Sequence, residues 1–293
     1  MASIELTPRG PFDMRLLAGF GFGPTTGRSR PAEPAMRLAF CLDDLNGHAG
    51  AALRQGDDGI VRGETHGDGE PAAVEAQVSR ILSLDHDGEA WPEVGRRDPV
   101  IGRLQGRFPG LRPPLFHSPY EAAAWAVISA RRPARQAATV RSEIATRLGR
   151  TFDLDGERLA AFPTPRRLLE VEPMNGLPDV KIQRLRAVAE AALDGRLDAG
   201  HLRSLAPDDA LARLQQLPGI GPFYATLVLV RSTGHADVLA TGEPRVLACA
   251  AHYYTLDAPP SPERFAELAE GWRPFRTWAT VLLRYAGERD GVV

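Results

Sequence analysis

PDDALARLQQLPGIGPFYATLVLVRSTGHADVLATGEP, residues 207–244, predicts a helical hairpin followed by a loop and a further helix. Leucines at helical spacing mark one face of the first helix, and Asp208 or Asp209 is available as its N-cap. This helix ends at Pro218-Gly219, and a more apolar helix follows the turn. The next helix opens at Glu243-Pro244, because proline is favoured at the first helical position.

The turn of this hairpin has the sequence of an anion site. Gly219 and Gly221 bracket Ile220, so the backbone can expose amide N–H groups at the start of the second helix, where they lack intrahelical partners. Such a turn suits a nucleic-acid phosphate, which is bound without regard to base. The alternative is an ordinary helical hairpin whose glycines only permit the turn.

The hairpin resembles that of the helix-hairpin-helix DNA glycosylases. The residues that match the motif of this superfamily are Leu217, Pro218, Gly219, Ile220, Gly221, Tyr224 and Ala225. The resemblance implies a structural Na⁺ or K⁺ held against a DNA phosphate by the backbone carbonyls of Gln215, Leu217 and Ile220. No other cofactor is expected. It also implies a catalytic acid about twenty residues further along the chain.

Length and composition indicate a globular protein of two domains. The 293 residues are 43% hydrophobic and 25% charged, which is ordinary for such a protein. We expect an N-terminal domain over residues 1–108 and a helical domain over 109–293. No apolar run approaches the ~20 residues of a membrane span, and the first residues lack the order of a signal peptide. The expected protein is a monomer of the cytoplasm or nucleoid with no membrane partner.

Cysteine usage and net charge limit the classes of function. Cys41 and Cys249 lie far apart, which argues against a disulfide framework and against a zinc site. The net charge of −2 is not the usual footprint of a DNA-binding protein. Binding to double-stranded DNA therefore requires a local basic face.

Lysine usage bears on the chemistry. Lys181 is the only lysine, and basic charge is otherwise carried by arginine. A glycosylase that also cuts the DNA backbone typically uses a lysine Schiff base. The position at which lysine-bearing relatives carry it is Phe223 here. The resemblance therefore implies a monofunctional enzyme.

The N-terminal part predicts a small antiparallel α/β domain. Met36–Leu42 and Gly59–Glu64 are typical of short strands, and Pro71–Leu84 has the apolar spacing of a helix. Gly23–Pro34 has the composition of a loop. The opening Pro11-Phe12-Asp13 is similar to the start of 3-methyladenine DNA glycosylase II, whose first domain looks like half of a TATA-binding protein.

From Ser118 onward the chain predicts almost only helix. Ser118 is the expected N-cap of a helix over Tyr120–Ala130, and Asp179–Leu193 has apolar residues at helical spacing. Further helices are expected over Pro262–Leu268 and Trp272–Tyr285. The segments 162–165 and 272–276 resemble elements of the same glycosylase. The predicted fold class is thus α+β, a mostly α-helical helix-hairpin-helix domain behind a small TATA-binding-protein-like domain.

Removal of a damaged base needs a carboxylate near the anomeric carbon, which stabilises a cation-like sugar and activates water. In the resembled family this is an Asp after the hairpin, and Glu243 stands in its place. The extra methylene displaces the carboxylate by roughly an ångström, which can cost about a hundredfold in rate. The alternative for Glu243 is a helix N-terminal acid stabilised by the helix dipole. Asp237 is the fallback carboxylate, with a surface loop acid as its plainer interpretation.

Arginines follow the helix that begins after Ser118. By position, Arg131 stands where the family places the side chain that fills the gap left by a flipped base, and Arg132 comes next. Arginine fills gaps, stacks on bases and binds phosphate. The alternative is a solvated arginine cluster at a helix end.

The family stacks the damaged base on aromatic faces. Phe223 matches one such position, whereas Leu227 and Arg284 stand where aromatic residues are usual. Trp278, Tyr285 and Phe12 are available to compensate for the missing rings. The predicted base pocket therefore contains Phe223, Leu227, Trp278, Arg284 and Phe12.

Together these residues predict a monofunctional DNA glycosylase that hydrolyses the N-glycosidic bond of alkylated or otherwise damaged bases in base excision repair. The alternative of a different class is a non-catalytic lesion- or DNA-structure-binding protein, in which Glu243 marks lost chemistry. A helical scaffold that binds no DNA is a third hypothesis.

Overall fold

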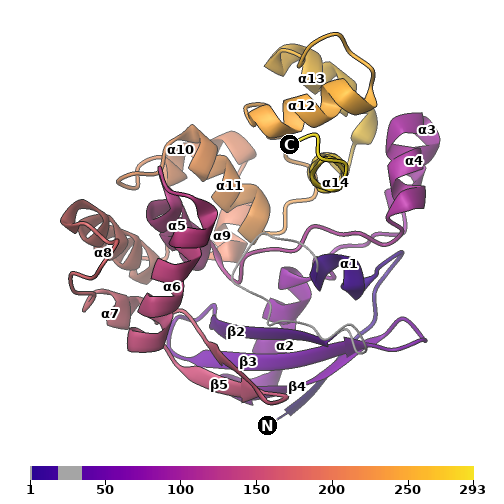
Figure 1. Ribbon diagram of the computed structural model, residues 1–293. Coiled ribbons are helices and arrows are strands. Elements are labelled where there is room, and N and C mark those ends of the chain that lie inside the picture. The colour runs from indigo at the N-terminus through magenta and orange to yellow at the C-terminus, as the bar shows by residue number, and fades with distance from the viewer. Residues whose placement is uncertain (1, 19–34) are drawn as a thin grey trace.

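The computed structural model describes residues 2–18 and 35–293. It combines a four-stranded antiparallel sheet and a two-stranded hairpin with two groups of helices (Figure 1). The predicted loop at Gly23–Pro34 lies outside the described residues. No helix in the described part of the chain is long and apolar enough to cross a membrane.

The sheet lies at the N-terminal end and has the strand order β1-β4-β3-β2, all antiparallel. Its strands are β1 (Ala2–Leu6), β2 (Ala35–Cys41), β3 (His48–Gln55) and β4 (Val61–Gly67). Between the first two strands lies the short helix α1 (Met14–Ala18). The strands predicted near Met36–Leu42 and Gly59–Glu64 are thus confirmed within three residues.

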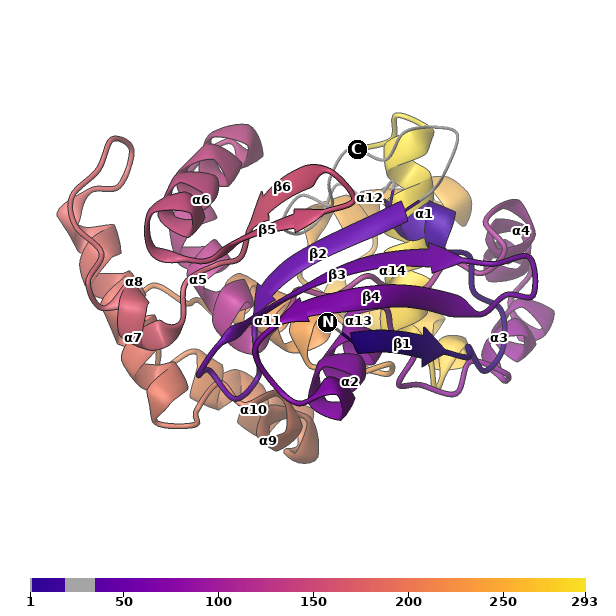
Figure 2. The same ribbon diagram turned by 90° about the horizontal axis from the view of Figure 1, so that it is seen from below.

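The two faces of the sheet are covered differently. On the inner face lies α2 (Pro71–Ile81), which begins at the predicted proline and ends earlier than predicted. Part of the outer face is covered by a second hairpin, β5 (Thr151–Leu154) with β6 (Glu157–Ala160), as Figure 2 shows. Gly50 makes room for this hairpin, because a Cβ there would lie 2.9 Å from the ring of Phe152. The expectation of almost only helix after Ser118 was wrong at this hairpin.

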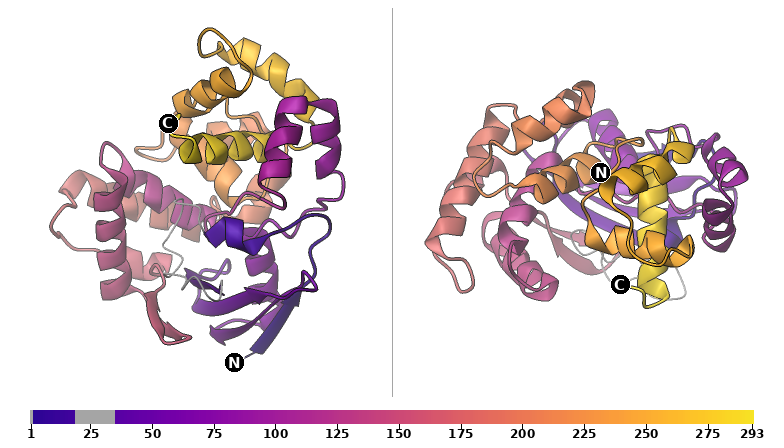
Figure 3. Two further views of the ribbon diagram at one scale, coloured as in Figure 1. Left: turned by 45° about the vertical axis from the view of Figure 1, so that its right-hand side comes forward. Right: turned by 90° about the horizontal axis from the view of Figure 1, so that it is seen from above.

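The helices form two groups (Figure 3). The first group packs around α5 and consists of α5 (Pro119–Ser129), α6 (Ala134–Leu148), α7 (Pro165–Leu168), α8 (Asp179–Leu193), α9 (Ala199–Ser204), α10 (Pro207–Leu214) and α11 (Pro222–Ser232). The second shares a core with the sheet and consists of α3 (Trp91–Arg97), α4 (Pro99–Arg107), α12 (Pro244–Tyr253), α13 (Pro262–Ala269), the 3₁₀ turn η1 (Glu270–Trp272) and α14 (Arg276–Arg289). This core runs across residue 108, so the two-domain boundary placed there stays a prediction.

The ends of three helices can be compared with the caps and bounds that the sequence predicts. The hydroxyl of Ser118 accepts the Glu121 N–H at 3.1 Å, which confirms the predicted cap of α5. The last helix begins at Arg276 rather than at Trp272, because residues 270–272 form the separate turn η1 and Pro274 follows it. The predicted cap of α10 was wrong, since Ala206 is the N-cap and Asp208 and Asp209 lie in the first turn.

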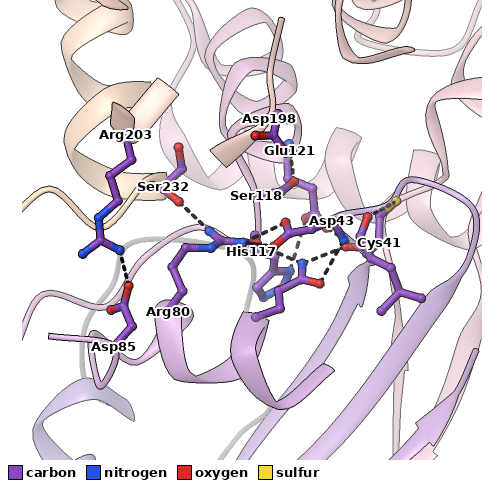
Figure 4. Close-up of polar contacts among 12 residues, drawn as sticks. Cys41, Asp43, Arg80, Asp85, His117, Ser118, Glu121, Asp198, Arg203 and Ser232 are labelled. Carbon is purple, nitrogen blue, oxygen red and sulfur yellow. Dashed lines mark hydrogen bonds and ion pairs between the residues drawn. The ribbon is translucent and has the colours of Figure 1, made fainter. Parts of the chain in front are cut away.

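A buried carboxylate joins the sheet to the first group of helices. Glu121 on α5 is 2% exposed, and its carboxylate accepts the backbone N–H of Cys41 at 3.1 Å and a guanidinium N–H of Arg141 at 2.8 Å. The His117 ring lies 3.3 Å away, and Figure 4 shows Cys41, His117 and Glu121 close together. Burial alone would raise the pKa of Glu121, but His117 and Arg141 outweigh it and lower the pKa to about 2.

We expect Glu121→Gln to lower the free energy of unfolding at pH 7 by on the order of 3 kcal/mol, because Arg141 is left as a buried charge without its partner. Because the pKa of Glu121 is lowered by folding, its contribution is complete above the ordinary value of 4.5 and is lost as the pH falls towards 2. Chemical denaturation between pH 2 and 7 measures this difference. The exposed Glu172→Gln is the control, expected to change stability by less than about 0.5 kcal/mol. An equal loss at every pH would contradict the electrostatic account.

Candidate nucleic-acid interface and base cavity

The predicted hairpin is present, with α10 and α11 joined by a turn at residues 215–221. Gly219 has a φ of +88°, in the left-handed region that favours glycine. The Ile220 N–H donates to the Leu217 carbonyl at 3.0 Å, and Gly221 is the N-cap of α11. The first residue of α11, Pro222, has no N–H, so the amides without intrahelical partners at this end are those of the turn and of the residues after Pro222.

Arg184 on α8 lies against this turn. A Cβ on Gly219 would come within 2.7 Å of the Arg184 Cδ, so the glycine also makes room for the arginine side chain. Arg184 was not among the predicted site residues. Its signal in the sequence was its place one helical turn after Lys181, on the same face of a predicted helix.

A cavity of about 850 Å³ runs beside the hairpin turn. It brings together cationic side chains from two places in the chain, namely Arg131 and Arg132 after α5 and Lys181 and Arg184 on α8. None of the described residues that line it is an Asp or a Glu. The turn thus has an uncompensated positive surface around it, although the whole chain carries a small negative charge.

The two arginines after α5 occupy a tight connection to α6. Arg131 is exposed and has a φ of +55°, which is unusual for a residue with a Cβ. Arg132 is half-buried, and its Nη1 has no hydrogen-bond partner among the residues described. Backbone strain of this kind clusters at ligand contacts.

Lys181 has a structural contact. Its Nζ donates to the carbonyls of Ile128 at 2.7 Å and Ala130 at 2.9 Å, so it satisfies two carbonyls at the C-terminal end of α5. Burial, reinforced by Arg132 and Arg184, lowers its pKa. The single lysine of the chain is therefore committed to holding the α5–α6 connection.

A second cavity of about 580 Å³ lies between α11, α12 and α14. Four of the predicted site residues line it, from all three helices: Glu243, Phe223, Leu227 and Arg284. The Phe223 residue is 51% exposed, and its ring packs edge-to-face on the ring of Tyr224, with ring centroids 5.2 Å apart. The rest of the wall is mainly aliphatic, so the cavity has one aromatic face.

Glu243 is the N-cap residue of α12, yet its side chain makes no capping hydrogen bond. The carboxylate lines the cavity instead, with Oε1 at 3.6 Å from the Arg284 Nε. Burial raises the pKa of Glu243 and outweighs the nearby arginines Arg284, Arg245 and Arg231. The carboxylate is thus directed towards the cavity and is held at a pKa above its usual range.

Arginines on two helices balance this carboxylate. The Nη1 of Arg284 lies 2.7 Å from Glu288, one turn later on α14, so this guanidinium is shared between two acids. Arg231 on α11 is 7% exposed and donates to the Pro114 carbonyl at 2.5 Å. Burial lowers the pKa of Arg231 to about 10, against the opposing effect of Glu243 and Glu288.

Two predicted pocket residues lie elsewhere. Trp278 is 2% exposed and packs on Trp91 and Phe275, with ring centroids 5.7 and 4.9 Å away. The Arg112 guanidinium lies over the rings of both Trp278 and Phe12, at 5.1 and 5.8 Å from their centroids. Neither aromatic residue lines the 580 Å³ cavity, because both belong to the core around the buried Arg112.

Asp237 is a structural acid. Its carboxylate accepts from the Arg276 Nε at 2.8 Å and from the Arg273 Nη1 at 2.9 Å, and its carbonyl accepts from the Arg276 Nη2 at 2.8 Å. Asp237 therefore ties the loop before α12 to the start of α14 and is not among the residues that line the cavity.

Helix α11 connects the two cavities. Its N-terminal end forms the hairpin turn, and one of its faces forms the wall opposite Glu243. A phosphate at the turn and a base in the 580 Å³ cavity would therefore be held by one rigid element. This arrangement of hairpin, following helix and acid is the one that the resemblance to the helix-hairpin-helix DNA glycosylases predicts.

The sequence was compared with protein families and with known proteins. No family model matches the chain. Over 209 residues it is 28% identical to the Mycobacterium tuberculosis protein named "Probable bifunctional transcriptional activator/DNA repair enzyme AlkA", covering 70% of this chain and 41% of that protein. The chain thus spans about two fifths of the length of this relative. Bacillus subtilis DNA-3-methyladenine glycosylase is 22% identical over 211 residues, covering 70% of this chain and 69% of that protein.

The fold has a counterpart over its whole length. The structure of 3-methyladenine DNA-glycosylase from Archaeoglobus fulgidus matches with a TM-score of 0.78 at 21% identity, covering 100% of both chains. The chain is thus similar in sequence to a protein named as a DNA repair enzyme and to a DNA-3-methyladenine glycosylase. Its fold is similar to that of a 3-methyladenine DNA-glycosylase.

We expect Glu243→Gln to raise the free energy of unfolding at neutral pH. The pKa of Glu243 is raised by folding, so ionisation destabilises the folded state, and the gain from the neutral amide grows as the pH rises above the ordinary value of 4.5. Denaturant unfolding of both proteins between pH 4 and 8 measures the difference. The exposed Glu190→Gln is the control. A variant less stable than the wild type at pH 8 would show that the carboxylate holds the fold together.

Proposed function

We propose that the protein is a monofunctional DNA glycosylase, which hydrolyses the N-glycosidic bond of an alkylated or otherwise damaged base in double-stranded DNA. The observation that carries this proposal is the Glu243 carboxylate, directed into a base-sized cavity and free of any capping hydrogen bond. The relatives named for DNA repair and for 3-methyladenine support the same class of substrate.

The proposed reaction begins when the damaged nucleotide leaves the stack and its base enters the cavity beside Phe223. As the bond between base and sugar breaks, the electron pair leaves with the base and the sugar becomes cation-like. The Glu243 carboxylate stabilises that charge and accepts a proton from the water that attacks the anomeric carbon. The raised pKa of Glu243 makes this carboxylate a better base than an exposed one.

DNA would be held at the hairpin. The amides of Gly219 and Gly221 bind a phosphate of the damaged strand, and Arg184 supplies countercharge beside them. Ile220 shapes the turn between them, because its own N–H is used by the Leu217 carbonyl. Arg131 fills the space that the flipped nucleotide leaves, and Arg132 contacts the distorted backbone. Support comes from the positive cavity that these residues share.

We propose that a monovalent cation, Na⁺ or K⁺, sits between the hairpin and the phosphate. Its ligands would be the backbone carbonyls of Gln215, Leu217 and Ile220, since carbonyl oxygens replace the hydration shell of such ions. The Leu217 carbonyl accepts one hydrogen bond, from Ile220, and has a second lone pair to offer. The ion would supply positive charge to the phosphate and take no part in the bond cleavage.

A lyase step is not part of the proposal. That step needs a lysine amine at the sugar, but Phe223 occupies the corresponding position and Lys181 donates to the end of α5. The product would therefore be an intact strand with an abasic site.

The first test is base release from methylated duplex DNA under single-turnover conditions. We expect the wild type to release damaged bases and to leave strands that break only after heat and alkali. Glu243→Gln should slow release by on the order of a hundredfold or more, because the developing positive charge loses its counterion. The exposed Glu172→Gln should keep the wild-type rate. If the wild type binds methylated DNA tightly but releases no base, the protein is a lesion-binding protein and not a glycosylase.

The second test concerns the hairpin. Arg184→Ala should weaken DNA binding equally for different sequences and reduce the slope of log affinity against log salt by about 0.9, the value for one lost phosphate contact. Fluorescence anisotropy over a series of salt concentrations measures the slope. Arg103→Ala removes an exposed arginine on α4, away from both cavities, and should leave it unchanged. Equal slopes for all three proteins would exclude Arg184 from the interface.

A further inference from the structure

A third cavity, of about 1130 Å³, runs along α6 and is here called the α6 groove. One wall is the face of α6 from Arg135 to Arg147, and the other is made by β6 and β2, which contribute Arg158 and Arg37. Figure 2 shows α6 beside the β5–β6 hairpin. Neither the hairpin cavity nor the base cavity shares a lining residue with this groove.

Three of the five arginines that line the α6 groove are paired with carboxylates. These pairs are Arg37 with Asp155 and Glu157 at 3.7 Å each, Arg141 with Glu121 at 2.8 Å, and Arg147 with Glu143 at 2.5 Å. Arg135 and Arg158 are exposed and have no ion pair with any residue of 2–18 or 35–293. Two unpaired guanidiniums facing one hollow favour an anionic ligand, and the planar fork of arginine suits phosphate oxygens.

The position of the groove identifies which phosphates it would meet. Helix α5 lies between the α6 groove on one side and the hairpin helices α10 and α11 on the other (Figure 2). The α5–α6 connection carries Arg131, and Arg135 follows in the first turn of α6. If the hairpin holds the damaged strand and Arg131 enters the base stack, the second strand lies on the far side of Arg131, which is the side of α6.

We propose that the α6 groove binds the sugar–phosphate backbone of the undamaged, complementary strand, with Arg135 and Arg158 as its phosphate ligands. This inference rests on the proposed function, because it takes the hairpin as the site of the damaged strand. It assigns the two strands of the duplex to opposite sides of α5.

The length of the groove fits a backbone segment. Residues 135–147 of α6 span about 18 Å at the usual rise of an α-helix. One strand of a duplex carries a phosphate about every 3.4 Å along the helix axis and further apart along its own winding path, so a few phosphates would lie along this face. Two arginines on opposite walls would hold a strand that lies between them.

The test compares duplex with single-stranded DNA. The probes are a labelled duplex with one abasic-site analogue, which cannot be processed, and the labelled damaged strand alone. Anisotropy titrations over a series of salt concentrations are made with the wild type, with Arg135→Ala/Arg158→Ala and with the control Arg103→Ala. Both substituted arginines of the groove are exposed, so folding should be preserved, and circular dichroism checks it.

The double variant should bind the duplex on the order of tenfold more weakly, with the salt slope reduced by about 1.8, or about 0.9 for each of two lost contacts. Its affinity for the single strand should equal that of the wild type, and Arg103→Ala should match the wild type on both probes.

Equal weakening on both probes would place these arginines on the damaged strand and overturn the inference. Unchanged binding of the duplex by the double variant would overturn the inference as well. If Arg184→Ala still loses affinity in that case, the proposed function stands. A wild type without salt-dependent affinity for either probe would overturn the proposed function together with the inference.

Discussion

The buried Glu121 carboxylate is the constraint on which the arrangement of this protein depends. It lies on α5 and is shared by the backbone of β2, a guanidinium of α6 and the ring of His117. An ionised carboxylate in an interior is tolerable only when its oxygens are satisfied and its charge is balanced. Strand β2 must therefore meet α5 and α6, which lie far from it in the sequence, at one point. That requirement fixes how the sheet, α5 and α6 are placed relative to one another, which apolar packing alone would leave less specific.

The positions of the basic side chains beside the hairpin turn depend on the buried Glu121 carboxylate. Because α5 and α6 are held at Glu121, the short connection between them has few conformations left, and Arg131 adopts a positive φ. Lys181 closes the end of α5 with two hydrogen bonds and thereby brings α8 and Arg184 towards the hairpin turn. The basic surface beside the turn thus results from the hydrogen bonds of Lys181 to the C-terminal end of α5. It needs no excess of positive charge in the whole chain, which explains how a protein of net charge −2 presents a cationic face.

Local signals in the sequence predicted the elements, and non-local packing decided which residues meet. The hairpin and the helix Asp179–Leu193 carry their own periodicity and turn residues, and both lie where the sequence placed them. Phe223 and Glu243 share a cavity because the spacing along α11 and the following loop is nearly fixed by the motif. Trp278 could not be assigned in this way, because its partners Trp91 and Arg112 lie far away in sequence. The β5–β6 hairpin was missed for a similar reason, as its short strands gain their burial only against the sheet.

The two departures of the base cavity from the resembled family are coupled by charge. A glutamate in place of aspartate carries its carboxylate further from the backbone, and an arginine in place of an aromatic residue puts a guanidinium within 3.6 Å of it. Glu243 and Glu288 lie near Arg284 and Arg231, and Arg245 adds a further positive charge near Glu243. Without Arg284, burial would raise the pKa of Glu243 still further and favour its neutral form, which could not stabilise a cationic sugar. Without Glu288, the Arg284 guanidinium would pair with the Glu243 carboxylate alone. Its positive charge would then no longer be divided between two acids. If Glu243 acts as proposed, the longer acid and the arginine work together, because Arg284 opposes the rise in the pKa of Glu243 that burial causes.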